Sequence, residues 1–181
     1  MRKRLALALS VASAGSVVML AAPANAGQSV TFTLTAGALQ VSDPASKSLG
    51  SASTGTATIT STLGTVTVTD NRGALGGTWT SSVTSTDFTT GAASAEETIA
   101  KARVDYYSGA ATASSGTAVA VPGQATALNK VALSAAQTAF SATATVGNNS
   151  TSWVPTVVVN VPAQAVVGTY SGTITHSVTG A

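Results

Sequence analysis

The chain has 181 residues, of which only 8% are charged and none is cysteine. The lack of cysteine excludes disulfides, thiolate metal sites and cysteine catalysis. A mean hydropathy of +0.35 argues against disorder in spite of the low charge, because disordered chains have low hydrophobicity.

The first 26 residues have the three parts of a secretory signal peptide. A basic start at residues 2–4 precedes an apolar stretch at residues 5–22, and Ala24 and Ala26 form an A-x-A cleavage site. An uncleaved membrane anchor is the alternative, but the apolar run is short and holds several serines. We therefore expect a secreted, extracellular protein that begins at Gly27 and has no membrane span.

Cleavage changes the charge of the chain. Three of its eight Lys and Arg residues lie in the signal, so five remain against six Asp and Glu, a net charge of −1. A protein of this charge has no basic field to attract nucleic acid or an anionic membrane. The remaining 155 of the 181 residues suit a single domain, 27–181.

Apolar residues alternate with threonine and serine along most of this domain. The pattern predicts strands that have one buried face and one wet face, as in antiparallel sheets. Predicted strands are 30–35, 57–60, 66–69, 140–146, 157–159 and 170–174, and predicted turns are 43–44, 70–73, 76–77, 121–123, 147–149 and 161–162. Short strands between turns predict an all-β fold, an antiparallel Ig-like β-sandwich.

Three segments are less regular. Residues 92–102 contain helix formers and allow one or two helical turns, with Ser94 and Glu97 as a capping box. Residues 109–116 are small and polar, so we expect a loop. Residues 128–139 are expected to be strand and loop, because Val131 and Leu133 alternate.

The segment Gly168-Thr169-Tyr170 leads into the last strand. A tyrosine at the start of a late strand in a sandwich often bonds back to the backbone of the preceding corner. Gly168 and Tyr170 are therefore predicted to be structural, as a tyrosine corner.

Five motifs follow one another in a recognisable order. They are Gly37-Ala38-Leu39, the Val66–Gly73 strand and turn with Asp70, Arg72 and Gly73, the Gly77–Val83 strand with Trp79, then Phe88, and finally Tyr170–Val178. This order resembles the WxL domain family of Gram-positive surface proteins, and the resemblance covers most of the mature chain. It implies non-covalent binding to the peptidoglycan of the cell wall.

Both motifs that give the family its name are degenerate here. Ser81 stands where the first motif has leucine, while His176 and Val178 stand where the second has tryptophan and leucine. If the motifs create wall binding, these changes alter it, and if they serve the fold, the changes matter less.

Three aromatic side chains are candidates for ligand binding. Trp79 is expected either in the core, which we favour, or stacked on a sugar ring. Trp153 follows a polar stretch that is predicted to be a loop, and binding residues often lie on loops of a rigid scaffold. His176, the one histidine, is expected to be exposed or half-buried.

Catalysis finds no support in the sequence, and we expect no enzyme, metal or cofactor. His176 has no Gly-x-Ser-x-Gly nucleophile to serve, and one histidine without cysteine is a poor zinc site. Glu96 and Glu97 do not face one another on any regular element, and Glu97 is expected to pair with Lys101. The Asp70–Gly73 segment lacks calcium-loop spacing, so Asp70 is expected to bond its own backbone in a turn.

An intramolecular Lys–Asn isopeptide bond is a further hypothesis, because a cysteine-free exported domain lacks covalent staples. Lys47, Lys101 and Lys130 are the candidate lysines and Asn160 the candidate asparagine.

Two functions of different class remain open. The first is a non-catalytic cell-surface protein that binds the wall, or a surface protein, non-covalently. The second is a structural subunit that self-associates into a surface layer or filament, because weakly charged sheet edges favour edge-to-edge pairing.

Overall fold

The computed structural model describes residues 28–181, so the predicted signal peptide and its cleavage site at Ala24 and Ala26 lie outside the described residues. The chain divides into two compact units after Leu34, and the larger unit, Thr35–Ala181, holds all the described strands. Among the described residues, no helix is long and apolar enough to cross a membrane.

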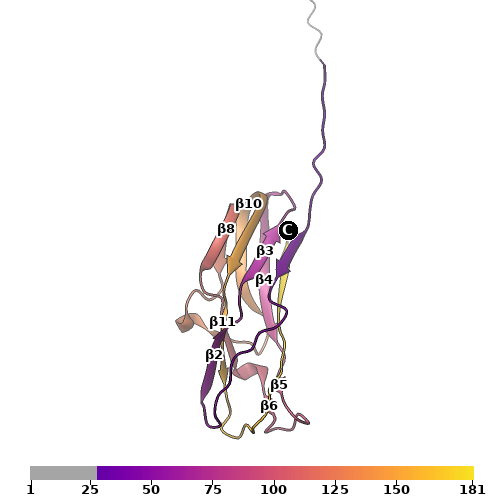
Figure 1. Cartoon of the computed structure of the whole chain (residues 1–181). Coiled ribbons are helices and arrows are strands. Elements are labelled where there is room, and N and C mark those ends of the chain that lie inside the picture. Colours follow the sequence, from indigo (N-terminus) through magenta and orange to yellow (C-terminus); the bar gives the residue numbers. More distant parts are fainter. Residues whose placement is uncertain (1–27) are drawn as a thin grey trace, which may run out of the picture. The chain divides into compact units, whose positions relative to one another are not determined.

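The larger unit is built almost entirely of strands (Figure 1). The described strands are β1 (Leu39–Ser42), β2 (Thr58–Thr62), β3 (Val66–Asp70), β4 (Leu75–Ser85), β5 (Phe88–Thr89), β6 (Thr98–Ile99), β7 (Val104–Tyr107), β8 (Ala111–Pro122), β9 (Val131–Ala132), β10 (Gln137–Trp153), β11 (Thr156–Asn160) and β12 (Ile174–Gly180). Two short 3-10 turns, η1 (Lys101–Arg103) and η2 (Ala127–Asn129), lie between them.

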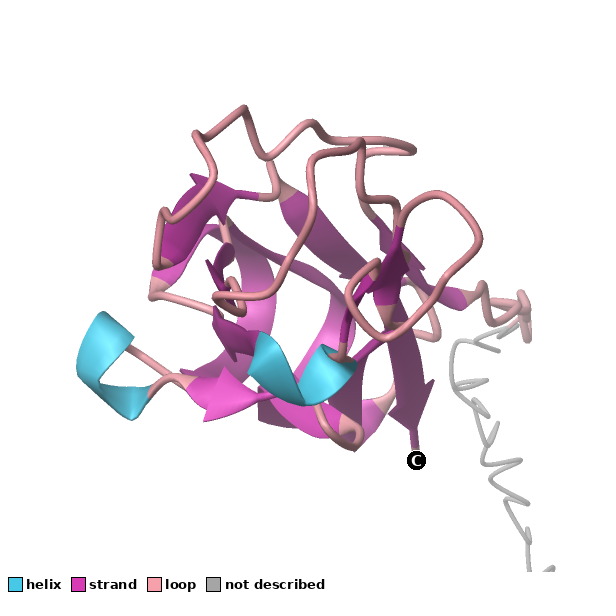
Figure 2. Cartoon of the chain, turned by 90° about the horizontal axis from the view of Figure 1, so that it is seen from below, coloured by secondary structure: helices cyan, strands magenta, loops and turns pink. Residues whose placement is uncertain are grey.

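The strands form three antiparallel sheets. The largest has the order β1-β3-β10-β4-β12, with β8 on the other side of β10. A second has the order β2-β11-β7-β9, and β5 pairs with β6 in a small third sheet. Figure 2 shows the strands and the loops that join them from below. The prediction of an all-β, antiparallel sandwich is confirmed.

Strand β10 bends so sharply that its two ends meet. Phe140 and Trp153 lie thirteen positions apart in this strand, yet their rings stack with centroids 4.7 Å apart. A straight strand would separate them by about 43 Å. The bend coincides with register shifts around Val146 and with a left-handed backbone at Ala144 (φ 53°). Because of it, one strand pairs with β4 through its first half and with β3 through its second.

The core collects the apolar residues that alternate along the strands. Strand β3 buries Val66 and Val68, while Thr67 and Thr69 between them are only half-buried. The other large buried side chains come from β4, β7, β10, β11 and the segments beside them: Trp79, Val83, Val104, Tyr106, Leu133, Phe140, Trp153 and Val157. The period-2 pattern thus locates most of the core correctly.

The first predicted strand is wrong, and of the last predicted strand, 170–174, only Ile174 lies in a strand, β12. Residues 28–38 form no strand, and Val30, Phe32 and Leu34 are 81%, 86% and 86% exposed. The alternation is that of a half-buried strand, but a strand needs a neighbour to pair with, and residues 28–34 of the smaller unit contain no second strand.

Three predicted interruptions are also wrong. The expected turn at 76–77 lies inside β4. Residues 111–116 of the expected loop belong to strand β8, and the expected turn at 147–149 lies inside β10. These two strands pair with each other along most of their lengths, and the bulged register absorbs Gly147 (φ 65°). Long-range pairing therefore overrides the local preference of Gly, Asn and Ser for turns.

No α-helix forms within residues 92–102. The carboxylate of Glu97 accepts hydrogen bonds from the backbone N–H groups of Ala92 and Ser94, which makes a tight turn before β6. The capping interaction from Glu97 to Ser94 is thus present, but it closes a turn rather than starting a helix.

Candidate functional site

Trp79 lies at the end of a buried polar network. Its indole Nε1–H donates to Asn149 Oδ1 at 3.3 Å, and the Asn149 amide donates to Asp70 Oδ2, also at 3.3 Å. Trp79 is 1% exposed. The preferred interpretation of Trp79 as a core residue is therefore correct, and its indole face is not available to stack on a sugar.

Asp70 and Arg72 complete this network in the turn between β3 and β4. Arg72 donates to both carboxylate oxygens of Asp70, from Nε at 2.9 Å and from Nη2 at 3.1 Å, while the Arg72 backbone N–H donates to Asp70 Oδ1 at 3.1 Å. The guanidinium of Arg72 holds the pKa of Asp70 below its usual range. Gly73 has a left-handed backbone (φ 67°), which glycine adopts at little cost. We call Trp79, Asn149, Asp70 and Arg72 the Trp79 network.

Trp153 lies at the end of a second buried network. Its Nε1–H donates to the hydroxyl of Tyr106 at 3.3 Å, and that hydroxyl lies 3.2 Å from Nε2 of His176. The other ring nitrogen of His176, Nδ1, lies 3.1 Å from Asp43 Oδ2. We call Trp153, Tyr106, His176 and Asp43 the Trp153 network.

One arrangement of protons satisfies every group of the Trp153 network. An indole N–H only donates and an ionised carboxylate only accepts. The Tyr106 hydroxyl therefore accepts from Trp153 and donates to Nε2 of a neutral His176, whose Nδ1–H donates to Asp43. Burial lowers the pKa of His176 more than Asp43 raises it, so the neutral ring is favoured. Burial also raises the pKa of Tyr106, which keeps its proton.

These contacts correct two predictions about the candidate ligand residues. Trp153 is not in a loop but closes strand β10, fully buried against Phe140. His176 is not exposed or half-buried but buried, at 8% exposure. In both cases the bend of β10 and the packing of β7 supply the cover, and neither is visible in the local sequence.

The positions that depart from the WxL motifs are core positions in this fold. Ser81, in place of leucine, is fully buried, and His176, in place of tryptophan, is buried against Tyr106 and Trp153. Val178 is half-buried and packs against the core. In this chain the motif positions therefore serve the packing of β4 and β12.

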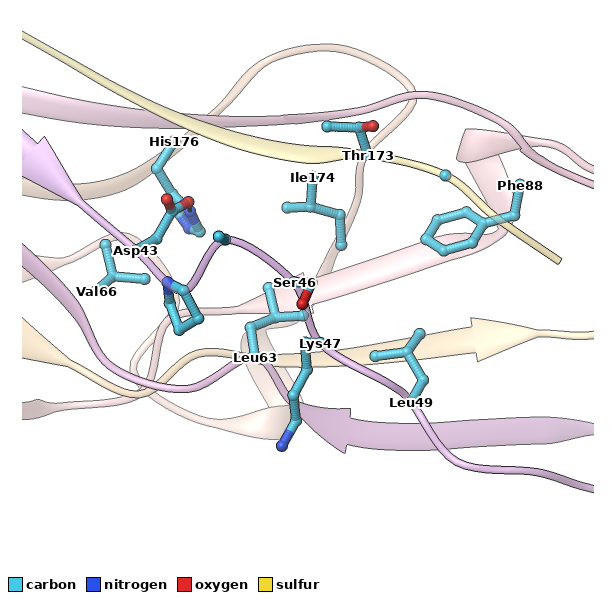
Figure 3. Close-up of a pocket in the computed structure, with 13 residues that line it drawn as sticks. Asp43, Ser46, Lys47, Leu49, Leu63, Val66, Phe88, Thr173, Ile174 and His176 are labelled. Atoms are coloured by element: carbon cyan, nitrogen blue, oxygen red, sulfur yellow. Dashed lines mark hydrogen bonds and ion pairs between the residues drawn. The ribbon is translucent and has the colours of Figure 1, made fainter. Parts of the chain in front are cut away.

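A cleft of about 250 Å³ lies beside the Trp153 network. His176 and Asp43 lie together at one end of it, Phe88 lies at the other, and Leu49 and Leu63 line it between them (Figure 3). Ser46 and Lys47 also line it between the two leucines, so polar and apolar side chains are mixed along its walls. Among the described residues, no group of three His, Asp or Glu side chains is placed to hold a metal ion.

Tyr170 bonds back across the corner before the last strand. Its hydroxyl donates to the backbone carbonyl of Val166, four residues upstream, at 3.0 Å and lies 3.1 Å from that of Glu96. A Cβ added at Gly168 would lie 2.4 Å from Oγ1 of Thr90, so only glycine fits there without a shift. This is the contact that the tyrosine corner predicts.

The acidic pair is used for turns rather than for chemistry. Glu97 bonds the backbone of Ala92 and Ser94, and these bonds lower its pKa. The predicted pair of Glu97 with Lys101 does not form among the described ion pairs. Glu96 instead accepts from the hydroxyl of Ser94 at 3.4 Å.

Two groups of the isopeptide hypothesis, Lys130 and Asn160, converge on the carboxylate of Asp105. Asp105 Oδ2 accepts from Lys130 Nζ at 2.5 Å and from Asn160 Nδ2 at 3.1 Å. However, the Lys130 side chain is 38% exposed on the outer face of the sheet. A partly exposed lysine beside a carboxylate is the ordinary arrangement of a surface ion pair, so an ion pair explains the cluster better than a covalent bond.

The most exposed strand is β8. Its first seven residues are all exposed, and Val119 and Val121 are 59% and 52% exposed further along. None of its twelve residues carries a charge. The sequence analysis missed this edge because the segment was taken for a loop, although its lack of charge was a visible signal.

No protein-family model, curated protein or solved structure matches this chain. The resemblance to the WxL domain family therefore stays a prediction from the motifs.

Proposed function

We propose that this protein is an exported, non-catalytic subunit of a bacterial cell surface that self-associates through the edges of its sheets. The observation that carries the proposal is the uncharged outer edge of β8. The signal-peptide pattern supports export to a place where such an assembly can form.

An unpaired strand edge offers a row of backbone donors and acceptors to any other strand. Proteins that stay monomeric protect such edges with charged side chains, especially lysine, or with a covering loop. Among the described residues, β8 pairs with β10 alone, and its sequence ATASSGTAVAVP holds no charge. Its single proline, Pro122, comes at its last residue, where it leaves the rest of the edge free.

Non-covalent binding to peptidoglycan, or to another surface protein, is the second candidate. The burial of Trp79, Trp153 and His176 argues against wall binding through the three aromatic candidates. What favours wall binding is the cleft beside Asp43 and His176, whose mixed polar and apolar lining suits a small amphipathic group. The cleft is small, so it would hold part of a wall polymer rather than a whole repeat.

Sedimentation velocity over a range of protein concentrations separates these functions, together with co-sedimentation on purified Gram-positive cell walls. Self-association predicts species larger than the monomer without any added ligand. Val119→Lys should abolish them, because a lysine on the edge strand opposes pairing. Leu128→Lys is the matched control, since Leu128 is 95% exposed in η2 and lies outside β8.

A monomer at every concentration would contradict self-association. Saturable binding of that monomer to walls would then leave wall binding as the function, and Asp43→Ala would test the cleft as its site.

A further inference from the structure

An unpaired strand-like segment precedes the sandwich. Val30, Phe32 and Leu34 alternate with Thr31, Thr33 and Thr35, so one face of an extended segment carries three large apolar side chains. All three are more exposed than the apolar residues of β8. Apolar side chains at this spacing in a folded protein are normally buried on one face of a sheet. The segment thus has the pattern of a strand but lacks a sheet.

Chain length limits where this segment can pair within its own molecule. The backbone N–H of Gly37 is bound to the carbonyl of Asn71 at 2.8 Å, which fixes the chain beside β1. Leu34 can lie at most about 11 Å from Gly37. Strand β8 is three neighbours away from β1 in the order β1-β3-β10-β8. That separation is about 14 Å across the sheet, so residues 30–35 cannot run in full along their own β8.

The same segment from a second copy has no such limit. The core-facing residues of β8, Ala118 and Ala120, are small and only half-buried, although they pack against the core. A strand added outside β8 would cover them, and Val30, Phe32 and Leu34 would supply the bulk that these alanines lack. Neither strand carries a charge, so no repulsion opposes the pairing.

The geometry points to donor-strand assembly: residues 30–35 of one copy pair as an added strand with the β8 edge of the next copy. Main-chain hydrogen bonds would give affinity and the apolar face would give register, as in other cases of strand addition. This rests on the proposed self-association and names the two surfaces that make it. Because donor and acceptor are different surfaces, the contact runs head to tail and builds an open filament.

The test uses one variant that removes each surface. Phe32→Asp disables the donor and leaves β8 intact, while Val119→Lys disables the acceptor and leaves residues 30–35 intact. Both side chains are exposed, so neither change disturbs the core. The full chain is expressed for export, and each purified protein is examined by sedimentation velocity over a range of concentrations. Circular dichroism checks that each variant is folded.

The expected result is a filament series for the wild type and a monomer for each variant alone. Loss of one buried phenylalanine weakens the association about tenfold or more. An equal mixture of the two variants should form a dimer and nothing larger, because it contains one working donor and one working acceptor. Leu128→Asp, the matched control, should assemble as the wild type does.

Each result that would contradict the proposal identifies which part of it is wrong. A wild type that stays monomeric overturns both self-association and the donor strand. A Phe32→Asp protein that assembles like the wild type overturns the donor strand alone and leaves self-association through another edge. A mixture that stays monomeric while both variants are folded overturns β8 as the acceptor.

Discussion

The two buried tryptophans of the sandwich lie in polar networks that end differently. The Trp79 network ends in a two-point ion pair between Asp70 and Arg72, in which Asp70 is fully buried. The Trp153 network ends in a contact between His176 and Asp43 at the edge of a cleft, where the Asp43 side chain is 39% exposed. Both networks satisfy an indole N–H inside the core, but only the second contains a histidine, the side chain whose ordinary pKa lies nearest to neutral pH.

The two networks are packed in a similar way but differ in how their ionisation responds to pH. A buried carboxylate held by an arginine stays ionised over nearly the whole pH range, because its pKa is lowered by a partner that does not lose its charge. A buried histidine stays neutral only while the pH is high enough, because burial opposes its charged form. The stabilisation that the Trp79 network provides should therefore not depend on pH near neutrality, whereas the stabilisation that the Trp153 network provides should depend on it.

Removing either tryptophan should give the largest loss of stability, and the loss should be similar for the two networks. Trp79→Ala and Trp153→Ala each delete a fully buried indole, so each should lower the free energy of unfolding by about 3–5 kcal/mol. Urea denaturation followed by circular dichroism measures this loss. A loss below about 1 kcal/mol for either variant would show that its tryptophan is not in the core.

Removing the aspartate at the end of each network should lower the free energy of unfolding by different amounts. Asp70→Ala leaves Arg72 and Asn149 without their partner in a buried site, which should cost about 2–3 kcal/mol. Asp43→Ala removes a partly exposed acceptor, whose place water can take, and should cost about 1 kcal/mol or less. The same denaturation experiment compares them. Equal losses would mean that the two networks contribute alike.

The pH dependence of stability should come from His176. Its pKa in the folded protein is below the ordinary value of 6.5, so the unfolded chain binds the proton more readily. The stabilisation is complete above pH 6.5 and is lost as the pH falls through the folded pKa, with a slope of at most about 1.4 kcal/mol per pH unit. The pKa of Asp70 is also lowered, so its stabilisation is complete above its ordinary value of 3.8 and is lost only as the pH falls below that value.

Urea denaturation at about pH 7.5 and at about pH 5 measures this effect. The control is His176→Gln, because a glutamine amide can donate to Asp43 and accept from Tyr106 but does not titrate in this range. The wild type should lose stability between the two pH values and the variant should lose much less. The same loss in both proteins would assign the pH dependence to another group.

The smallest effect is expected at the surface pair of Lys130 and Asp105, outside both networks. Lys130→Ala should change the free energy of unfolding by about 0.5 kcal/mol or less, because the ion pair is partly exposed. Intact mass spectrometry of the wild type should give the full sequence mass of the processed chain. A mass lower by one ammonia, restored in Lys130→Ala, would instead show an isopeptide bond to Asn160.

Local patterns predicted the parts of the structure that depend on local contacts. The turn at Asp70 follows from a side chain that bonds the backbone two residues on, and the corner at Tyr170 from a contact four residues upstream. The candidate site could not be predicted in the same way. Trp153 and His176 meet Tyr106 only because β10 bends and β7 packs beneath it, and both contacts join residues at least 47 positions apart.

The sequence by itself determined the all-β class, most of the buried faces and the main turns, because alternation and turn chemistry act over a few residues. Only the tertiary structure decided which alternating segment obtained a partner and which did not. Val66 and Val68 lie in a strand between two neighbours, whereas Val30 and Phe32 have the same pattern and stay exposed. Strand formation requires hydrogen bonds to another segment, and which segment is near depends on the whole chain.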